Sequence, residues 1–120
     1  MYQRGIRGAI TVENNTLYDI EKATVELYSQ ITELNDFNAQ DISHIIFTMT
    51  QDLNCAYPAK FLRQNFDIKD VPLMCIQELN IENSLKMCLR ILVVINTDKT
   101  QSEIKHVYLG GAELLRPDLK

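Results

Sequence analysis

The sequence predicts an α+β domain in which a mixed sheet packs on one long helix. Residues 17–34 carry apolar side chains at helical spacing, and residues 85–97 form a nearly continuous apolar run that is typical of a central strand. Further strand-like runs, each bounded by polar residues, occupy positions 2–12, 42–50, 71–75 and 104–109. The order of these elements indicates a single domain over residues 1–120.

Local signals mark where the helices begin. Thr16 is a good N-cap, with Asp19 three residues later. Pro58 suits the first position of a short helix over residues 59–65. In the strand at 85–97, apolar residues alternate with a set that includes Arg90, and the high apolar content predicts cover on both faces of this strand.

Composition excludes several classes of protein. The net charge of −4 argues against a general nucleic-acid surface. Cys55, Cys75 and Cys88 have no paired spacing, so we expect neither a disulfide scaffold nor a metal site. With no signal peptide and no membrane-spanning run in the sequence, we expect a cytoplasmic, reduced protein. A chain of 120 residues has little room for an internal pocket, which favours oligomerisation.

Arg90 is the most unusual residue, because a guanidinium within an apolar strand is costly to bury without an anionic partner. Either Glu78 or a ligand can be that partner. Arg7 has small neighbours on its own face, Gly5 and Ala9, which leave room for a ligand or a second chain. A solvated strand arginine is the equally simple alternative.

Other polar residues have similar alternatives. Lys60 and Arg63 are three residues apart and so share a helix face after Tyr57, where they form either a pocket rim or a solvated surface. Cys75 has no histidine near it in sequence, which favours a buried small side chain over a catalytic thiolate. His44 lies in a predicted strand with no second metal-binding residue at a useful spacing, which favours a structural role over metal binding.

Together these side chains describe a site for a small polyanion such as a dicarboxylate, because arginine binds carboxylates in a bidentate manner. The sequence has no glycine-rich phosphate loop, zinc motif or Ser/His/Asp arrangement. It therefore predicts an anion-binding domain, and leaves open an enzyme without metal, cofactor or covalent intermediate. The set comprises Arg7, Lys60, Arg63, Cys75, Glu78, Arg90, Tyr108 and Arg116.

Several motifs resemble one known family over essentially all 120 residues. They are RGIRGAITV near the start, PAKFLR at 58–63, CIQE at 75–78, LKMCLRILV around Arg90, and HVYL and LLRPDL near the end. The chain resembles a monofunctional chorismate mutase of the AroH type. The resemblance implies a five-stranded mixed sheet on a long helix and a homotrimer that forms a pseudo-α/β barrel. It also implies active sites in clefts between subunits, and an isomerase that converts chorismate to prephenate for phenylalanine and tyrosine biosynthesis.

The resemblance also implies roles for individual residues. Arg7 and Tyr108 would bind a substrate carboxylate. Arg90 would reach the ether oxygen and the side-chain carboxylate, with Glu78 held apart from it at the opposite end of the breaking bond. Glu78 and Cys75 would meet the ring hydroxyl. The lining of the cleft and its mouth would be formed by Tyr57, Ala59, Lys60, Leu73, Met74, Arg63, Leu115 and Arg116. Tyr57 and Met74 stand where phenylalanine and threonine are familiar in the family.

Two other functions compete with this one. One is a trimeric module that binds a small carboxylate without catalysis, and the other is a trimeric imine deaminase of the RidA type. A plain binder has no need of a carboxylate beside its anionic ligand, so the grouping of Glu78 with Arg90 and Tyr108 favours the mutase.

Overall fold

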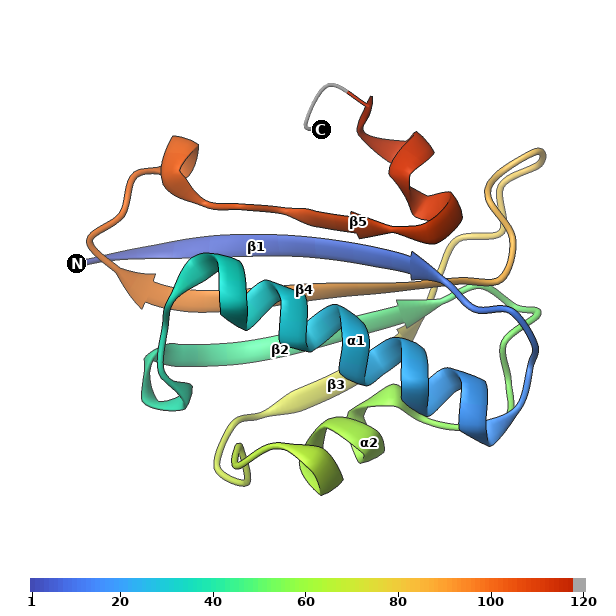
Figure 1. Ribbon diagram of the computed structural model, residues 1–120, viewed down its shortest axis with the longest axis horizontal. Helices are drawn as coiled ribbons and strands as arrows, with labels where there is room; N and C mark the ends of the chain where they lie inside the picture. The colour runs from blue at the N-terminus through green and yellow to red at the C-terminus, as the bar shows by residue number, and fades with distance from the viewer. Residues whose placement is uncertain (118–120) are drawn as a thin grey trace.

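The computed structural model describes residues 1–117 as a five-stranded mixed sheet with both α-helices on one face (Figure 1). The strand order is β3-β2-β4-β1-β5. The elements are β1 (Tyr2–Thr11), α1 (Leu17–Asn35), β2 (Ile42–Met49), α2 (Pro58–Asn65), β3 (Leu73–Gln77), β4 (Cys88–Thr97) and β5 (Val107–Leu109), with short 3-10 turns η1 (Ala39–Asp41), η2 (Gln101–Glu103) and η3 (Gly110–Leu115). The predicted α+β class and mixed sheet are confirmed.

The long central strand β4 runs antiparallel to both of its neighbours, β1 and β2. The outer pairs, β1 with β5 and β2 with β3, are parallel. This register places Arg90 opposite Ala9 on one side and opposite Thr48 on the other. Because directly opposed residues point to the same face of a sheet, the register decides which side chains share a surface.

The predicted helix starts are correct. The Thr16 side chain accepts a hydrogen bond from the backbone N–H of Asp19 at 3.1 Å, and Pro58 occupies the first turn of α2. Helix α1 buries Ile20, Leu27 and Ile31 against the sheet. Helix α2 packs beside α1 and adds to the cover, so the helix layer is not made by one long helix alone. No helix within residues 1–117 is long and apolar enough to cross a membrane.

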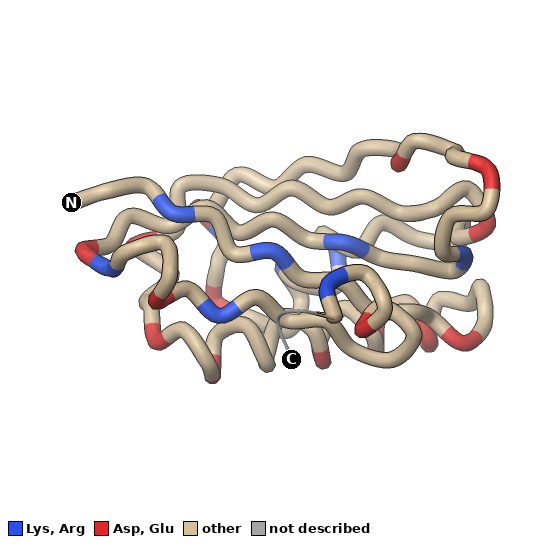
Figure 2. The backbone as a smooth tube through the Cα atoms, turned by 90° about the horizontal axis from the view of Figure 1, so that it is seen from above, with Lys and Arg blue, Asp and Glu red and all other residues tan. Residues whose placement is uncertain are grey.

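The two faces of β4 differ: the chain itself buries one face, while the predicted cover of the other face, by neighbouring subunits, stays a prediction. Leu89, Ile91, Val93 and Ile95 are buried against the helices, whereas Arg90 and its neighbours on the opposite face are only partly buried. Figure 2 shows the helical turns on one side of the extended strands. We call the other side the open face and define it by Arg7, Thr48, Arg90, Leu92 and Tyr108. Within residues 1–117, η3 and Leu85 cover part of it at one end.

Strand boundaries also differ from those predicted. β4 begins at Cys88 rather than at residue 85, because Met87 has a left-handed backbone with φ of 51° and interrupts the extended chain. β5 begins at Val107 rather than at 104, and β3 extends to Gln77. In each case the apolar pattern marks the region correctly, but distant contacts set its ends.

Candidate active site

A row of side chains crosses the open face at the level of Arg90. Tyr108 on β5 is opposite Ala9 on β1, Ala9 is opposite Arg90 on β4, and Arg90 is opposite Thr48 on β2. Arg7 lies one step along β1 on the same face, opposite Leu92. An open hollow of about 240 Å³ is lined by Arg7, Ile46, Thr48, Arg90, Ile91 and Leu92.

Glu78 and Arg90 form an ion pair in this structure. Glu78 Oε1 lies 2.6 Å from Arg90 Nε and accepts a hydrogen bond from the Thr48 hydroxyl at 3.1 Å. The two side chains are only 13% and 26% exposed, so the carboxylate partly offsets the cost of burying the guanidinium. Glu78 is thus the anionic partner of Arg90 in this structure, which is one of the two alternatives that the sequence leaves open. The separation of the two groups across a bound ligand stays a prediction.

Two buried donors on the open face are not satisfied. The Arg90 Nε–H and the Tyr108 hydroxyl are inaccessible to solvent, and neither has an aligned hydrogen-bond partner within residues 1–117. The contact of Arg90 with Glu78 is therefore close in distance but poor in direction. Buried donors without acceptors are uncommon, and a catalytic role or an ordered water is among the explanations for them. Here they lie on neighbouring parts of one row.

His106, which directly precedes β5, contacts the backbone of Arg7. The backbone N–H of Arg7 donates to His106 Nδ1 at 3.0 Å. Burial, followed by the nearby Arg116 and Arg7 guanidiniums, lowers the pKa of His106. Both guanidiniums therefore act on His106, and the lowered pKa favours its neutral imidazole. The cationic end of the open face is thus able to attract an anion.

η3 closes the end of the open face next to this row. Ala112 packs on Ala9 and Cys88, with Tyr108 and Leu115 against them. Ala9 is therefore buried, and of the two small neighbours of Arg7 only Gly5 leaves open space. Burial raises the pKa of the Cys88 thiol to about 11, against the opposing effect of the Arg90 guanidinium. Cys88 is a neutral packing group. Residues 118 and 119 of the LLRPDL motif lie outside the described part of the chain.

The remaining predicted site residues lie at the opposite edge of the sheet, on α2 and β3. Tyr57 is the exposed N-cap of α2, Lys60 is exposed, and Ala59 is partly buried. On β3, Met74 shares the open face with Ile46, while Leu73 and Cys75 point toward the core. β2 separates this edge from Arg90. Within one chain, the predicted site residues therefore lie in two separate groups, one around Arg90 and one on α2 and β3.

Two residues at this edge have further structural contacts. The Arg63 guanidinium donates to the backbone carbonyls of Lys69 at 3.1 Å and Val71 at 3.3 Å, so it braces the loop that leads into β3. Burial raises the pKa of Cys75, while a weaker effect from a hydrogen bond with the Ala59 backbone lowers it. The thiol is thus favoured over the thiolate, as expected from its sequence context.

Comparison with known proteins decides the family. The model of the family described as chorismate mutase type I matches residues 3–119. The chain belongs to this family. A chorismate mutase AroH from Bacillus subtilis (strain 168) is 40% identical over 99% of this chain and 94% of that protein. A second AroH, from Thermus thermophilus, is 43% identical over 98% of this chain and 96% of that protein.

A solved structure agrees with the chorismate mutase assignment. A chorismate mutase from Clostridium thermocellum superposes with a TM-score of 0.88 at 42% identity, covering 92% of this chain and 97% of that one. The resemblance predicted from the sequence motifs is confirmed. The comparisons support neither the carboxylate-binding module nor the imine deaminase.

Sequence reasoning missed two polar residues that contact the predicted site of this chorismate mutase family member. Thr48 binds the carboxylate of Glu78, and His106 accepts from the backbone of Arg7. Thr48 had a weak signal, because it is a polar residue inside an apolar strand. His106 had none, since its contact depends on the parallel pairing of the first and last strands.

Proposed function

We propose that this chain is a chorismate mutase that rearranges chorismate to prephenate, in the biosynthesis of phenylalanine and tyrosine. The observation that carries the proposal is the partly buried Arg90 on the central strand, with Glu78 in contact and an unsatisfied Tyr108 hydroxyl in the same row. The family assignment indicates that the substrate is chorismate. Chorismate is a dianion, which a cationic row of side chains can bind. The open face supplies fixed donors where a dianion needs them.

The rearrangement breaks a C–O bond and forms a C–C bond within one molecule. The protein therefore has to hold the substrate in its compact reactive conformer and to stabilise the charge that develops in the transition state. Arg7 and Tyr108 bind one carboxylate, which fixes the position of the substrate. Arg90 binds the other carboxylate and the ether oxygen, which gains negative charge as the bond breaks.

The ion pair with Glu78 refines the role of Arg90. The contact is at Nε, whereas the two terminal nitrogens of a guanidinium carry four of its five N–H donors. Glu78 can therefore orient Arg90 from behind while the terminal nitrogens meet the substrate. Both described contacts of Glu78 use Oε1. Its Oε2 is our candidate acceptor for the ring hydroxyl, together with Cys75.

We further propose a homotrimer with active sites between subunits. The open face presents partly exposed apolar side chains, including Met74 at 60% exposure and Ile76 at 47%, which a single small chain leaves uncovered. The separation of the Arg90 group from the α2 and β3 group supports a shared site. In such a site the residues Tyr57, Ala59, Lys60, Arg63, Leu73, Met74 and Cys75 of one subunit would face Arg7, Glu78, Arg90, Tyr108, Leu115 and Arg116 of the next.

The remaining parts of the proposal concern the whole chain. Residues 1–120 form one chorismate mutase domain that works in the cytoplasm without metal or cofactor. All three cysteines are free thiols, which suits a reducing compartment. The acidic net charge argues against nucleic-acid binding.

The direct test is to add chorismate to the purified protein and follow the loss of its ultraviolet absorbance. We expect saturable turnover that yields prephenate. No loss at micromolar enzyme would contradict the proposed reaction. A matched control is the Arg90→Ala variant, in which the absorbance should fall far more slowly.

A mixing experiment tests the shared site. Arg90→Ala and Lys60→Glu alter the two groups of residues separately, and Lys60→Glu places a negative charge where a dianion should bind. If subunits share sites, refolding the two variants together gives some sites with both halves intact. Activity should then exceed the sum of the separate variants. Activity equal to that sum would place the site within one chain.

A further inference from the structure

The loop between β3 and β4 carries Glu78 at its start and joins β4 two residues before Arg90. One short segment at the end of β2, Thr48 to Asp52, holds both ends of this loop. At the start, the Glu78 N–H donates to the Met49 carbonyl at 3.1 Å, and the Thr48 hydroxyl donates to Glu78 Oε1. The segment therefore contacts the loop at the point where Glu78 meets Arg90.

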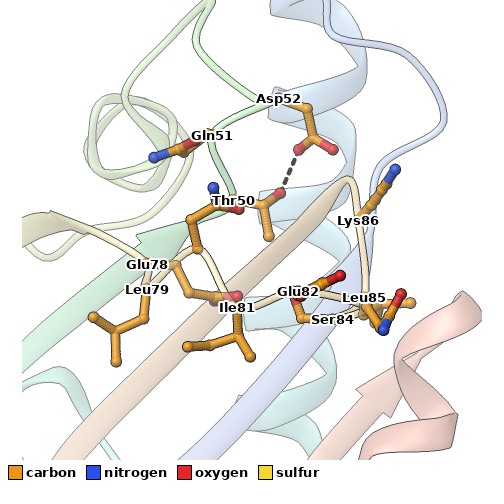
Figure 3. Close-up of a pocket in the computed structure, with 12 residues that line it drawn as sticks. Thr50, Gln51, Asp52, Glu78, Leu79, Ile81, Glu82, Ser84, Leu85 and Lys86 are labelled. Atoms are coloured by element: carbon orange, nitrogen blue, oxygen red, sulfur yellow. Dashed lines mark hydrogen bonds between the residues drawn. The ribbon is translucent and has the colours of Figure 1, made fainter.

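The other end of the loop is held by Asp52. The backbone N–H of Met87 donates to Asp52 Oδ1 at 3.1 Å and to Oδ2 at 3.0 Å. The Thr50 hydroxyl donates to Asp52 Oδ1 and accepts from the Cys88 N–H at 3.0 Å. Figure 3 shows Thr50 and Asp52 pointing toward each other above the loop. Hydrogen bonds to a carboxylate are stronger than those to a neutral acceptor.

The carboxylate stabilises a conformation that the chain does not favour by itself. Met87 has φ of 51°, a left-handed conformation in which any residue with a Cβ is strained. The Val12 N–H donates to the Met87 carbonyl at 2.7 Å, and β4 begins directly after Met87. A change in the Met87 backbone would therefore move the start of β4, and with it the strand segment that carries Arg90.

Asp52 is close to the charged pair but does not have to touch a ligand. It lines a cavity of about 360 Å³ between its own segment and the loop, together with Glu78 and Lys86. Its charge, like those of Arg90 and Glu78, acts on the Cys88 thiol between them. Both of its oxygens accept from the Met87 N–H, which suits an anchor for the backbone.

We propose that Asp52 is a positioning residue: by holding Met87 in its left-handed conformation, it sets the geometry of the Glu78–Arg90 pair. This inference rests on the proposed mutase function. A displacement of about 1 Å at the reacting groups can cost ~10²-fold in rate, so the residue matters for turnover without contacting the substrate. One substrate carboxylate is bound by Arg7 and Tyr108 on β1 and β5, which Asp52 does not anchor, so this part of the affinity should persist without Asp52.

Four variants test the proposal: Asp52→Ala, Asp52→Asn, Met87→Gly and the double variant Asp52→Ala/Met87→Gly. Glycine adopts the left-handed conformation without strain, so Met87→Gly removes the need for the carboxylate. We expect Asp52→Ala to lower kcat by ~10- to 10²-fold with a much smaller change in KM. Asp52→Asn, which keeps one acceptor oxygen, should lie between. Met87→Gly should be close to wild type, and the double variant should recover most of kcat.

Turnover has to be expressed per folded protein, measured by circular dichroism. Asp98→Ala is the control for loss of an exposed aspartate, because Asp98 lies just after the end of β4. A purely structural Asp52 would lower the unfolding midpoint and leave kcat per folded enzyme unchanged, which would overturn the proposal. Equal loss in Asp52→Ala and in the double variant would also overturn it. If Asp52→Ala does not fold, the intermediate kcat of Asp52→Asn is the deciding result. A wild-type protein without activity on chorismate would instead refute the proposed function itself.

Discussion

The two faces of β4 show how one strand serves two purposes. Ile91 and Val93 are buried beneath the helices, while Arg90 and Leu92, which alternate with them in sequence, remain partly exposed on the open face. The helix-covered face is completed by the chain itself. The open face keeps an ion pair, two unsatisfied donors and apolar side chains near the surface. Stability is therefore concentrated on one face and the candidate chemistry on the other.

The largest effect expected from this division between the two faces of β4 is a loss of turnover when Arg90 is changed. Arg90→Lys removes the planar fork but keeps a positive charge, and lysine cannot donate to two acceptors in the same geometry. We expect kcat on chorismate to fall by ~10²–10³-fold, judging from other fixed donors to a developing negative charge. The unfolding midpoint should change little, because the side chain lies outside the helix-covered core. Near-normal turnover in the folded variant would remove Arg90 from its catalytic role.

Two glycines on β1 provide a matched test of stability. A Cβ on Gly8 would lie 2.9 Å from Ile31 Cδ1 and from Ile91 Cγ2 beneath the helices, whereas one on Gly5 would meet only Leu92 Cδ1 at 3.2 Å on the open face. Gly8→Ala should lower the free energy of unfolding by ~1–3 kcal/mol through overpacking. Gly5→Ala should change it by less than ~0.5 kcal/mol. Urea unfolding of both variants measures the difference, and equal costs would contradict the distinction between the faces.

The smallest expected effect concerns pH. Burial, Arg116 and Arg7 lower the pKa of His106 in the folded protein, so the unfolded chain binds a proton more readily. Stability should therefore fall as the pH drops through the ordinary histidine range near ~6.5, and this loss should level off below the folded pKa. At neutral pH and above, the effect should vanish.

His106→Asn isolates the pH effect, because asparagine offers an acceptor to the Arg7 N–H but does not titrate. The difference in unfolding midpoint between variant and wild type should change in favour of the variant between pH 7 and pH 5. A constant difference over this range would show that His106 does not titrate on unfolding.

Much of the fold could be predicted because its signals are local. The Thr16 cap, Pro58 and the apolar periodicities identify both helices and all five strands. The start of β4 could not be predicted, since the left-handed Met87 is held by Asp52 from a distant segment. The apolar run of β4 predicts cover on both faces of the strand, and the helices of the same chain bury one of them. An apolar run reports that a face should be buried, but not whether its own chain buries it.

The candidate site was predicted as a set of residues, and its arrangement was not. Motifs identified Arg90 and Glu78, but their direct contact depends on where the β3–β4 loop ends. The separation of Cys75 from Arg90 depends on register, because the two residues point to opposite faces of the sheet. The individual substrate contacts remain predictions.

The strand order has a consequence for how the chain folds. β1 lies between β4 and β5, so the first strand to be synthesised is paired by the last two. Its backbone hydrogen bonds have to wait for nearly the whole chain, and such distant pairings slow folding. During synthesis, α1 and β2 emerge long before β1 has a partner. A newly made chain thus has an unpaired N-terminal strand until residue 97 has left the ribosome, and that interval is when aggregation is the greatest risk.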